Sequence, residues 1–207
     1  MSPRHFRISE ATHLIHPAFV NLLTFHLHEP LPGLVLPEMT AEISPEEAAR
    51  RYRAIVLTTL NQMKGLANTR IRLKITPDDA GEAVRFWLLP RLADRWQSEA
   101  ETFRSEGWEI DFSRESGDFE IHAYAEILCP DLSARWVHTG LLGFGRTISR
   151  VRGLAPDGEE YFLAETAGNF PERLLPALPV IRSDADWQTA LDSPIGAALK
   201  KAWEQEI

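Results

Sequence analysis

The sequence has little of several features that would point to a function directly. It contains one cysteine in 207 residues, so no disulfide can form within the chain, which fits the reducing cytoplasm. No apolar run approaches the roughly 18 residues that a membrane-spanning helix needs, and residues 1–16 lack the apolar segment of a signal peptide. We therefore expect a cytoplasmic protein that has no membrane partner.

Positive charge is also scarce. The chain has 22 Lys and Arg against 30 Asp and Glu, which gives a formal net charge of −8. Nucleic acids bind to positively charged surfaces, so we expect no nucleic-acid partner. With 44% hydrophobic and 25% charged residues, the composition is that of an ordinary globular domain with a sizeable core.

The common chemical motifs are missing as well. The sequence has no phosphate-binding loop, no glycine-rich dinucleotide motif, no zinc spacing and no nucleophile-elbow motif. The residues alone therefore indicate an α/β domain and leave its reaction open.

Helical and strand patterns alternate along the chain. Ser44, Pro45 and Glu47 form a helix-start signal, and one face of the helix that follows is apolar. Strands are expected in segments 18–28, 69–76, 107–113, 121–128, 147–155, 159–165 and 176–182. Helices are expected in segments 44–63, 76–96, 132–145, 186–191 and 194–203, with a break or kink at Pro90.

This alternation predicts a three-layer α/β/α arrangement around a mostly parallel sheet. We expect an N-terminal arm over residues 1–18 and a single domain over residues 19–207. Ligands of such sheets sit beyond the carboxyl ends of the strands. The turns that follow His28 and Cys129 are therefore expected to share one rim.

Three features near that rim have both a chemical and a structural interpretation. His26 and His28 lie on the same face of a strand and could bind a metal with Glu29, as in a hydrolase, or could simply be polar residues at a strand end. Cys129 could be a nucleophile, but Pro130 follows it and no cation is near in sequence, so we favour a small buried apolar residue.

Further along, Asp157 and Gly158 form a hairpin signal. Asp186 could cap the helix that follows it.

Several segments, in serial order from about residue 19 to 192, resemble a bacterial family of GT-A-fold transferase-like proteins. This family of unknown function is associated with radical-SAM and selenodomain genes and lies in the nucleotide-diphospho-sugar transferase superfamily. The segment "FHLHEPLPGLVLPEM" is similar to its opening strand and its Pro-x-Pro-Gly-x-Val-Lys-Thr-Arg-Leu loop. "LCPDLS", "LAPDGEEYFLAE" and "LPVIRSDADWQTAL" are similar to three later motifs. The resemblance implies a GT-A-like fold and a cleft for a sugar nucleotide with Mg²⁺ or Mn²⁺.

The resemblance implies a set of cleft residues. They are Pro32, Gly33, Cys129, Pro130, Asp131, Gly158, Tyr161, Asp184 and Asp186, with Asp157 as the candidate catalytic residue.

Other positions depart from the family pattern. The departing positions are Leu36, Glu38, Leu128, Glu159 and Glu160. Leu36 and Glu38 replace cations of the loop that would bind phosphates, and Leu128 replaces the Asp that would bind the metal. At about 4 Å and an effective dielectric of about 20, replacing attraction by repulsion costs several kcal/mol of phosphate binding.

These departures lead to two main hypotheses. The first is a degenerate, non-catalytic member that holds no metal or other cofactor and has a small-molecule or protein partner of unknown identity. The alternative is an active, divergent glycosyl- or nucleotidyltransferase that uses Mg²⁺ or Mn²⁺ with a sugar nucleotide. In that alternative, Asp157 and either Asp184 or Asp186 take over the metal or base roles.

Overall fold

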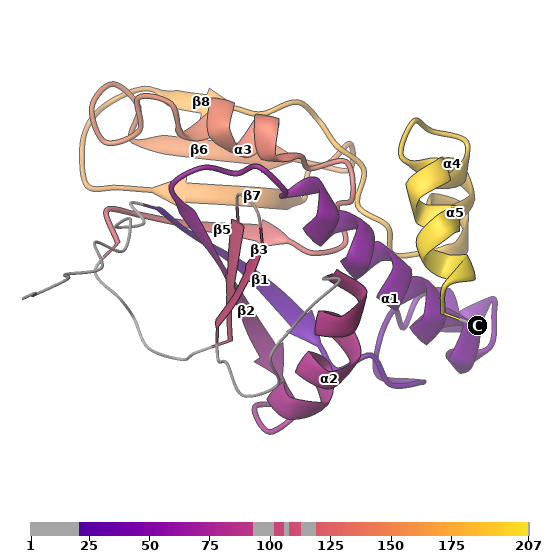
Figure 1. Ribbon diagram of the computed structural model, residues 1–207. Coiled ribbons are helices and arrows are strands. Elements are labelled where there is room, and N and C mark those ends of the chain that lie inside the picture. Colours follow the sequence, from indigo (N-terminus) through magenta and orange to yellow (C-terminus); the bar gives the residue numbers. More distant parts are fainter. Residues whose placement is uncertain (1–20, 93–101, 106–107, 113–118, 207) are drawn as a thin grey trace, which may run out of the picture.

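A computed structural model describes residues 21–92, 102–105, 108–112 and 119–206 (Figure 1). The expected N-terminal arm, residues 1–18, lies outside this part of the chain. Within it, eight strands form one sheet in the order β3-β4-β2-β1-β5-β7-β6-β8. The strands are β1 (Asn21–His28), β2 (Thr69–Thr76), β3 (Thr102–Ser105), β4 (Trp108–Asp111), β5 (Ile121–Glu126), β6 (Arg150–Leu154), β7 (Glu160–Glu165) and β8 (Glu172–Leu174).

The middle of the sheet is parallel, as predicted. β1 pairs in parallel with β2 on one side and with β5 on the other, and β2 pairs in parallel with β4. β7 runs antiparallel to both β5 and β6, and β3 runs antiparallel to β4. β6 and β8 form the remaining parallel pair. The sheet is therefore mixed, with a parallel centre that sets the position of the rim.

Helix α1 (Pro45–Gln62) begins where the sequence predicts. The Ser44 hydroxyl accepts a hydrogen bond from the Glu47 amide at 3.2 Å, so the first turn of the helix is capped. Its apolar face is buried, as expected, at Ala48, Tyr52, Ile55, Val56, Thr59 and Met63. Together with Leu23, Phe25 and Leu27 of β1, this face forms the centre of the core.

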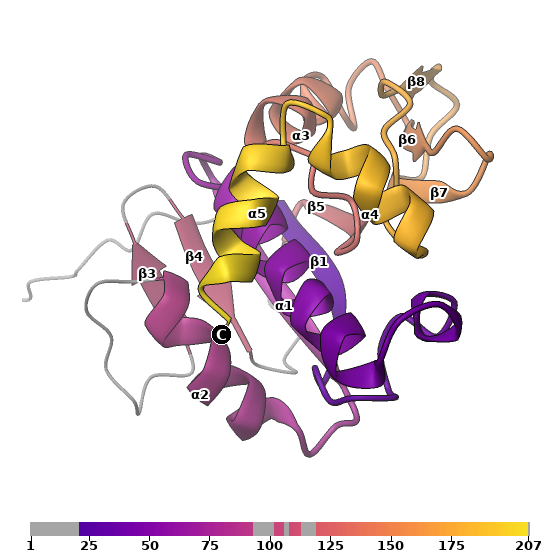
Figure 2. The same ribbon diagram turned by 90° about the vertical axis from the view of Figure 1, so that its right-hand side faces the viewer.

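Helices α1, α2 (Gly81–Leu92) and α5 (Gly196–Glu204) lie on one side of the sheet (Figure 2). The remaining helices are α3 (Ala134–Leu141) and α4 (Asp184–Leu191), with a short 3₁₀ turn η1 (Met39–Ala41) after β1. None of the described helices is long and apolar enough to cross a membrane.

Several elements differ from the sequence-based expectation. Residues 176–182 form no strand, and instead the Ile181 amide donates a single hydrogen bond to the Leu128 carbonyl at 2.9 Å. α3 ends at Leu141 rather than at residue 145, because Gly143 and Gly145 take positive φ angles of 80° and 74°. Pro90 does not end α2, which continues to Leu92. β3 and β8 were not expected.

Candidate functional site

The carboxyl ends of β1 and β5 lie side by side at one rim of the sheet. The two strands pair in parallel, with His26 opposite Glu126. Because β7 runs antiparallel to β5, the β6–β7 turn at residues 155–159 reaches the same rim. The prediction that the turns following His28 and Cys129 share a rim is therefore confirmed.

Hydrogen bonds from α1, from residue 181 and within the turn itself hold the backbone of the turn after β5. The Leu128 amide donates to the Glu126 carboxylate at 3.1 Å, and the Leu128 carbonyl accepts the Ile181 amide. The Thr59 hydroxyl of α1 donates to the Ile127 carbonyl at 2.8 Å. Hydrogen bonds therefore hold the backbone of Leu128 at the strand end, and one of them ends on the Glu126 carboxylate.

Cys129 and its neighbours are largely enclosed. The Cys129 side chain is fully buried and Pro130 is also buried. Burial raises the pKa of the Cys129 thiol to about 12, so the thiol stays protonated near neutral pH. Burial also raises the pKa of Asp131, which is half-buried. Cys129 therefore packs as the small apolar residue that the sequence favours and presents no thiolate.

The β6–β7 turn places two carboxylates around one arginine. Asp157 accepts the Glu159 amide at 3.0 Å, and Gly158 turns the chain with a φ of 90°. Arg182 then reaches both carboxylates, at 3.5 Å from Asp157 and 2.5 Å from Glu159. The hairpin expected from Asp157-Gly158 is confirmed, and Glu159, a position that departs from the family pattern, has an ion-pair partner.

The next two residues point to different surroundings. Glu160 pairs with Arg152 on the neighbouring strand at 2.6 Å. Tyr161 is buried, and its hydroxyl donates to the Pro176 carbonyl at 2.6 Å. Burial raises the pKa of this phenol. Tyr161 therefore packs in the core beneath the rim.

Both acidic residues at the start of α4 form contacts that stabilise the fold. Ser183, and not Asp186 as expected, is the N-cap residue, and Asp186 completes a capping box with it. Burial acts to raise the pKa of Asp186, but the amides of Ser183 and Arg182 outweigh it and hold this pKa below its ordinary value. Asp184 forms an ion pair with Arg51 of α1, and that hydrogen bond lowers the pKa of Asp184.

The loop between β1 and η1 begins at the same rim. Pro32 and Gly33 are exposed, and Gly33 takes a φ of 80°. Leu36 is buried with an unusual positive φ of 49°, whereas Glu38 is exposed. In the described part of the chain, no hydrogen bond or ion pair joins Glu38 to the β6–β7 turn.

All four predicted segments reach this rim, and hydrogen bonds or ion pairs link three of them to one another. The β5 turn, the β6–β7 turn and the start of α4 are linked through Ile181 and Arg182. Leu36 faces the core, so of the two replaced loop positions only Glu38 presents a side chain at the surface.

The resemblance implies a carboxylate ligand for Mg²⁺ or Mn²⁺ at the position of Leu128, whose side chain has no oxygen. No group of three His, Cys, Asp or Glu side chains within the described residues is placed to hold a metal ion. His26 and His28 therefore belong to no such group.

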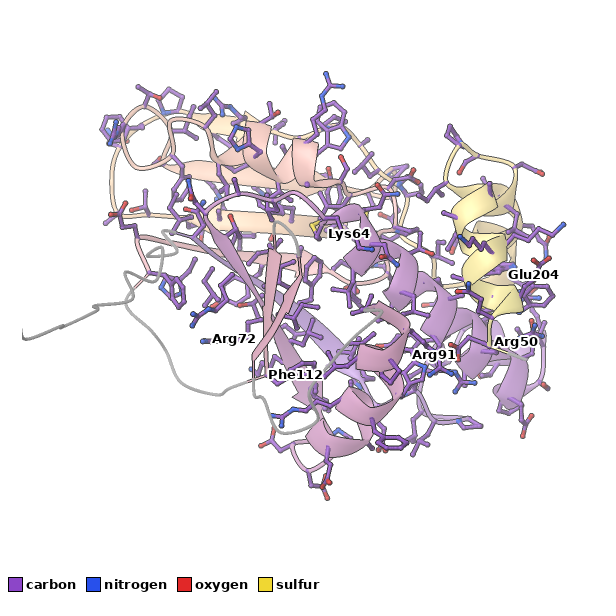
Figure 3. The ribbon with its side chains drawn as sticks, in the orientation of Figure 1. Arg50, Lys64, Arg72, Arg91, Phe112 and Glu204 are labelled. Carbon is purple, nitrogen blue, oxygen red and sulfur yellow. The ribbon has the colours of Figure 1, made fainter. Side chains whose placement is uncertain are left out.

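Sequence reasoning missed a pocket lined mainly by strands β1, β2 and β5. The pocket has a volume of about 440 Å³, and its polar lining includes Arg72, Lys74, His122 and Tyr124. Arg72 points away from the helices (Figure 3). The signal was present in β2, because a strand buried on both faces does not carry alternating Arg and Lys.

The fold can be compared with solved structures. A protein provisionally described as a nucleotide-diphospho-sugar transferase from Desulfovibrio desulfuricans G20 superposes with a TM-score of 0.63 at 14% identity, covering 90% of this chain and 97% of that one. The chain has a GT-A-like fold. This fold agrees with the expectation from the resemblance.

Two further structures are more distant from this GT-A-like chain. Rv0371c from Mycobacterium tuberculosis H37Rv has a TM-score of 0.48 at 11% identity, covering 84% of this chain and 100% of that one. The 4-diphosphocytidyl-2C-methyl-D-erythritol synthase from Anaerococcus prevotii has a TM-score of 0.47 at 9% identity, covering 87% and 99%. No family model matches the sequence, and a search of curated proteins gives no significant match.

Proposed function

We propose that this protein is a degenerate member of the nucleotide-diphospho-sugar transferase superfamily that does not carry out metal-dependent sugar-nucleotide transfer. One observation carries the proposal. Leu128 stands at the strand end, at the position where the resemblance implies an acidic metal ligand, and the nearby Glu126 carboxylate accepts the Leu128 amide. A divalent metal at this position would therefore meet an apolar side chain in place of a carboxylate.

The other candidate carboxylates of the rim support the same proposal. Asp184 is paired with Arg51, and Asp186 accepts hydrogen bonds from the start of α4. Moving either one to a metal would break a helix cap or an ion pair. The rim keeps its shape through these contacts, and the same contacts occupy the groups that catalysis would need.

The β1–η1 loop opposes phosphate binding through Glu38. A carboxylate beside a pyrophosphate is repelled by about 4 kcal/mol at 4 Å and an effective dielectric of about 20, before any salt screening. Leu36 is buried and adds no cation in return. The loop thus disfavours the ligand that the fold would otherwise suggest.

The active, divergent transferase remains the alternative hypothesis, and Asp157 is the residue on which it rests. Its side chain is 57% exposed, more than that of Asp184, so it is the accessible candidate base. A general base must reach an acceptor hydroxyl directly or through one water. Here the carboxylate already accepts the Glu159 amide and faces Arg182.

Calorimetry tests the proposal. UDP-glucose, GDP-mannose and CTP are titrated into the full chain with Mn²⁺ and again with excess EDTA. We expect no saturable heat in either condition. Micromolar binding that EDTA removes would overturn the proposal. In that case Asp157→Asn, with Asp192→Asn as the matched surface control, shows whether the divergent transferase uses Asp157.

A further inference from the structure

A second pocket lies among helices α1, α4 and α5. α5 lies over α1 on the side of α1 that faces away from the sheet (Figure 2). The pocket has a volume of about 530 Å³, and its lining includes Trp187 and Leu191 of α4 and Lys200 and Trp203 of α5. This volume is typical of sites for small organic molecules. We call this pocket the tryptophan groove.

Side-chain contacts hold the two tryptophans of the tryptophan groove in place. The Trp203 indole N–H donates to Glu47 at 2.9 Å, and the Arg50 guanidinium lies 4.0 Å from the centre of the indole ring. Arg50 also donates to the Trp203 carbonyl at 3.2 Å. Trp187 is 2% exposed, with the Arg51 guanidinium 5.3 Å from its ring. The Trp203 indole is therefore held in place before a ligand binds, which lowers the entropic cost of binding.

The charges of the groove select the kind of ligand. Arg51 also lines it, but two carboxylates neutralise this arginine, Glu47 at 3.0 Å and Asp184. Lys200 is exposed, and no ion pair engages it within the described residues. One uncompensated cation suits a single carboxylate. A pyrophosphate carries more negative charge than this groove can balance.

We propose that the tryptophan groove binds a small monocarboxylate with a ring-sized apolar body. The apolar body lies against Leu191 and the half-buried indole of Trp203, over a floor to which the buried Trp187 belongs. The carboxylate pairs with the Lys200 ammonium at the opening. The groove borders the start of α4, because its lining residue Arg51 pairs with Asp184, but none of its lining residues is a candidate cleft residue of the rim.

A matched pair of probes tests the charge requirement. 3-Phenylpropanoate and the neutral 3-phenylpropanamide are titrated calorimetrically into the full chain at low salt. We expect the acid to bind at least five-fold more tightly than the amide. Lys200→Ala should remove this preference. Lys201→Ala changes the adjacent exposed lysine, which lies outside the pocket lining, and should preserve the preference.

A second matched pair tests the location. Ala197 lines the groove and Ala198 does not, although both are exposed on α5. Ala197→Leu should reduce the affinity for both probes at least ten-fold, and Ala198→Leu should leave it unchanged. Circular dichroism confirms that each variant is folded. No binding of the acid, equal binding of acid and amide, or equal effects of the paired variants would overturn the proposal, as would displacement of the acid by UDP-glucose.

Discussion

The Glu206 carboxylate lies 2.7 Å from Nε of Arg53 and so joins the end of the described chain to the middle of α1. It also accepts hydrogen bonds from Nε of Arg91 at 2.5 Å and from the Trp87 indole at 3.3 Å, both on α2. The Glu206 side chain is 2% exposed. One buried carboxylate therefore connects the C-terminus to two core helices, and removing its charge leaves two guanidinium groups without their partner.

We predict that Glu206→Gln lowers the free energy of unfolding by about 2 kcal/mol, because two arginines lose their charged partner. The loss is smaller than for a fully buried ion pair, since both arginines are partly exposed and water can solvate them. Urea denaturation measures the change. Glu204→Gln is the control, since Glu204 is an exposed residue of the same terminal segment (Figure 3) and its replacement should change stability by less than about 0.5 kcal/mol. Equal losses in the two variants would show that Glu206 does not join the helices.

A steric prediction concerns Gly153 in β6. A Cβ atom added there would lie 2.3 Å from the Tyr161 ring, which is closer than any normal contact. Gly153→Ala should therefore lower the free energy of unfolding by about 2 kcal/mol, as overpacking usually does. Gly81→Ala is the control, because a Cβ atom at Gly81 meets no atom within 4 Å. Thermal unfolding of both variants measures the difference, and similar melting temperatures would contradict the prediction.

Local signals in the sequence were enough to predict α1 and the hairpin at Asp157-Gly158. The Ser44–Glu47 cap acts over one helical turn, and the Asp157–Glu159 contact spans two residues. The shared rim followed from the alternation of strands and helices. These features depend on neighbours in the sequence or on a general rule of parallel sheets, so they can be predicted from the sequence.

The features that sequence reasoning missed depend on distant partners. β8 has three residues, and its ladder exists because β6 lies beside it. The ion pair between Arg51 and Asp184 joins residues 133 positions apart. It gives Asp184 a structural partner that its acidic neighbourhood in the sequence does not reveal. The residue-level interpretation of the rim therefore needed the folded chain.

Cys129 offers a labelling experiment, because it is the only cysteine in the chain. Burial raises its pKa to about 12, so we expect almost no reaction with Ellman's reagent at pH 8 under native conditions and complete reaction in urea. The folded-state pKa lies above the unfolded value, so the contribution of this thiol to stability is complete below about pH 8.5 and is lost as the pH rises towards 12. Rapid labelling of the native protein would contradict its burial.

Asp186 gives a prediction at acidic pH. Its pKa is lowered overall in the folded state, since the hydrogen bonds from Ser183 and Arg182 outweigh the effect of burial. A carboxyl with a lowered folded-state pKa stabilises the protein above its unfolded pKa of about 3.9, and this stabilisation is lost as the pH falls through the folded-state pKa. Asp186→Asn should lower the free energy of unfolding by about 1 kcal/mol at pH 7, as loss of a helix cap does, and by progressively less below pH 4.

The matched control for Asp186 is Asp192→Asn at the other end of α4. Asp192 is exposed, and its side chain accepts no hydrogen bond among the described residues. Urea denaturation over a series of pH values should show a slope between pH 3 and 5 that is smaller for Asp186→Asn than for the unmodified chain and unchanged for Asp192→Asn. If Asp186→Asn keeps the full slope, the capping box does not account for the acid sensitivity, and Asp186 is free to act at the rim.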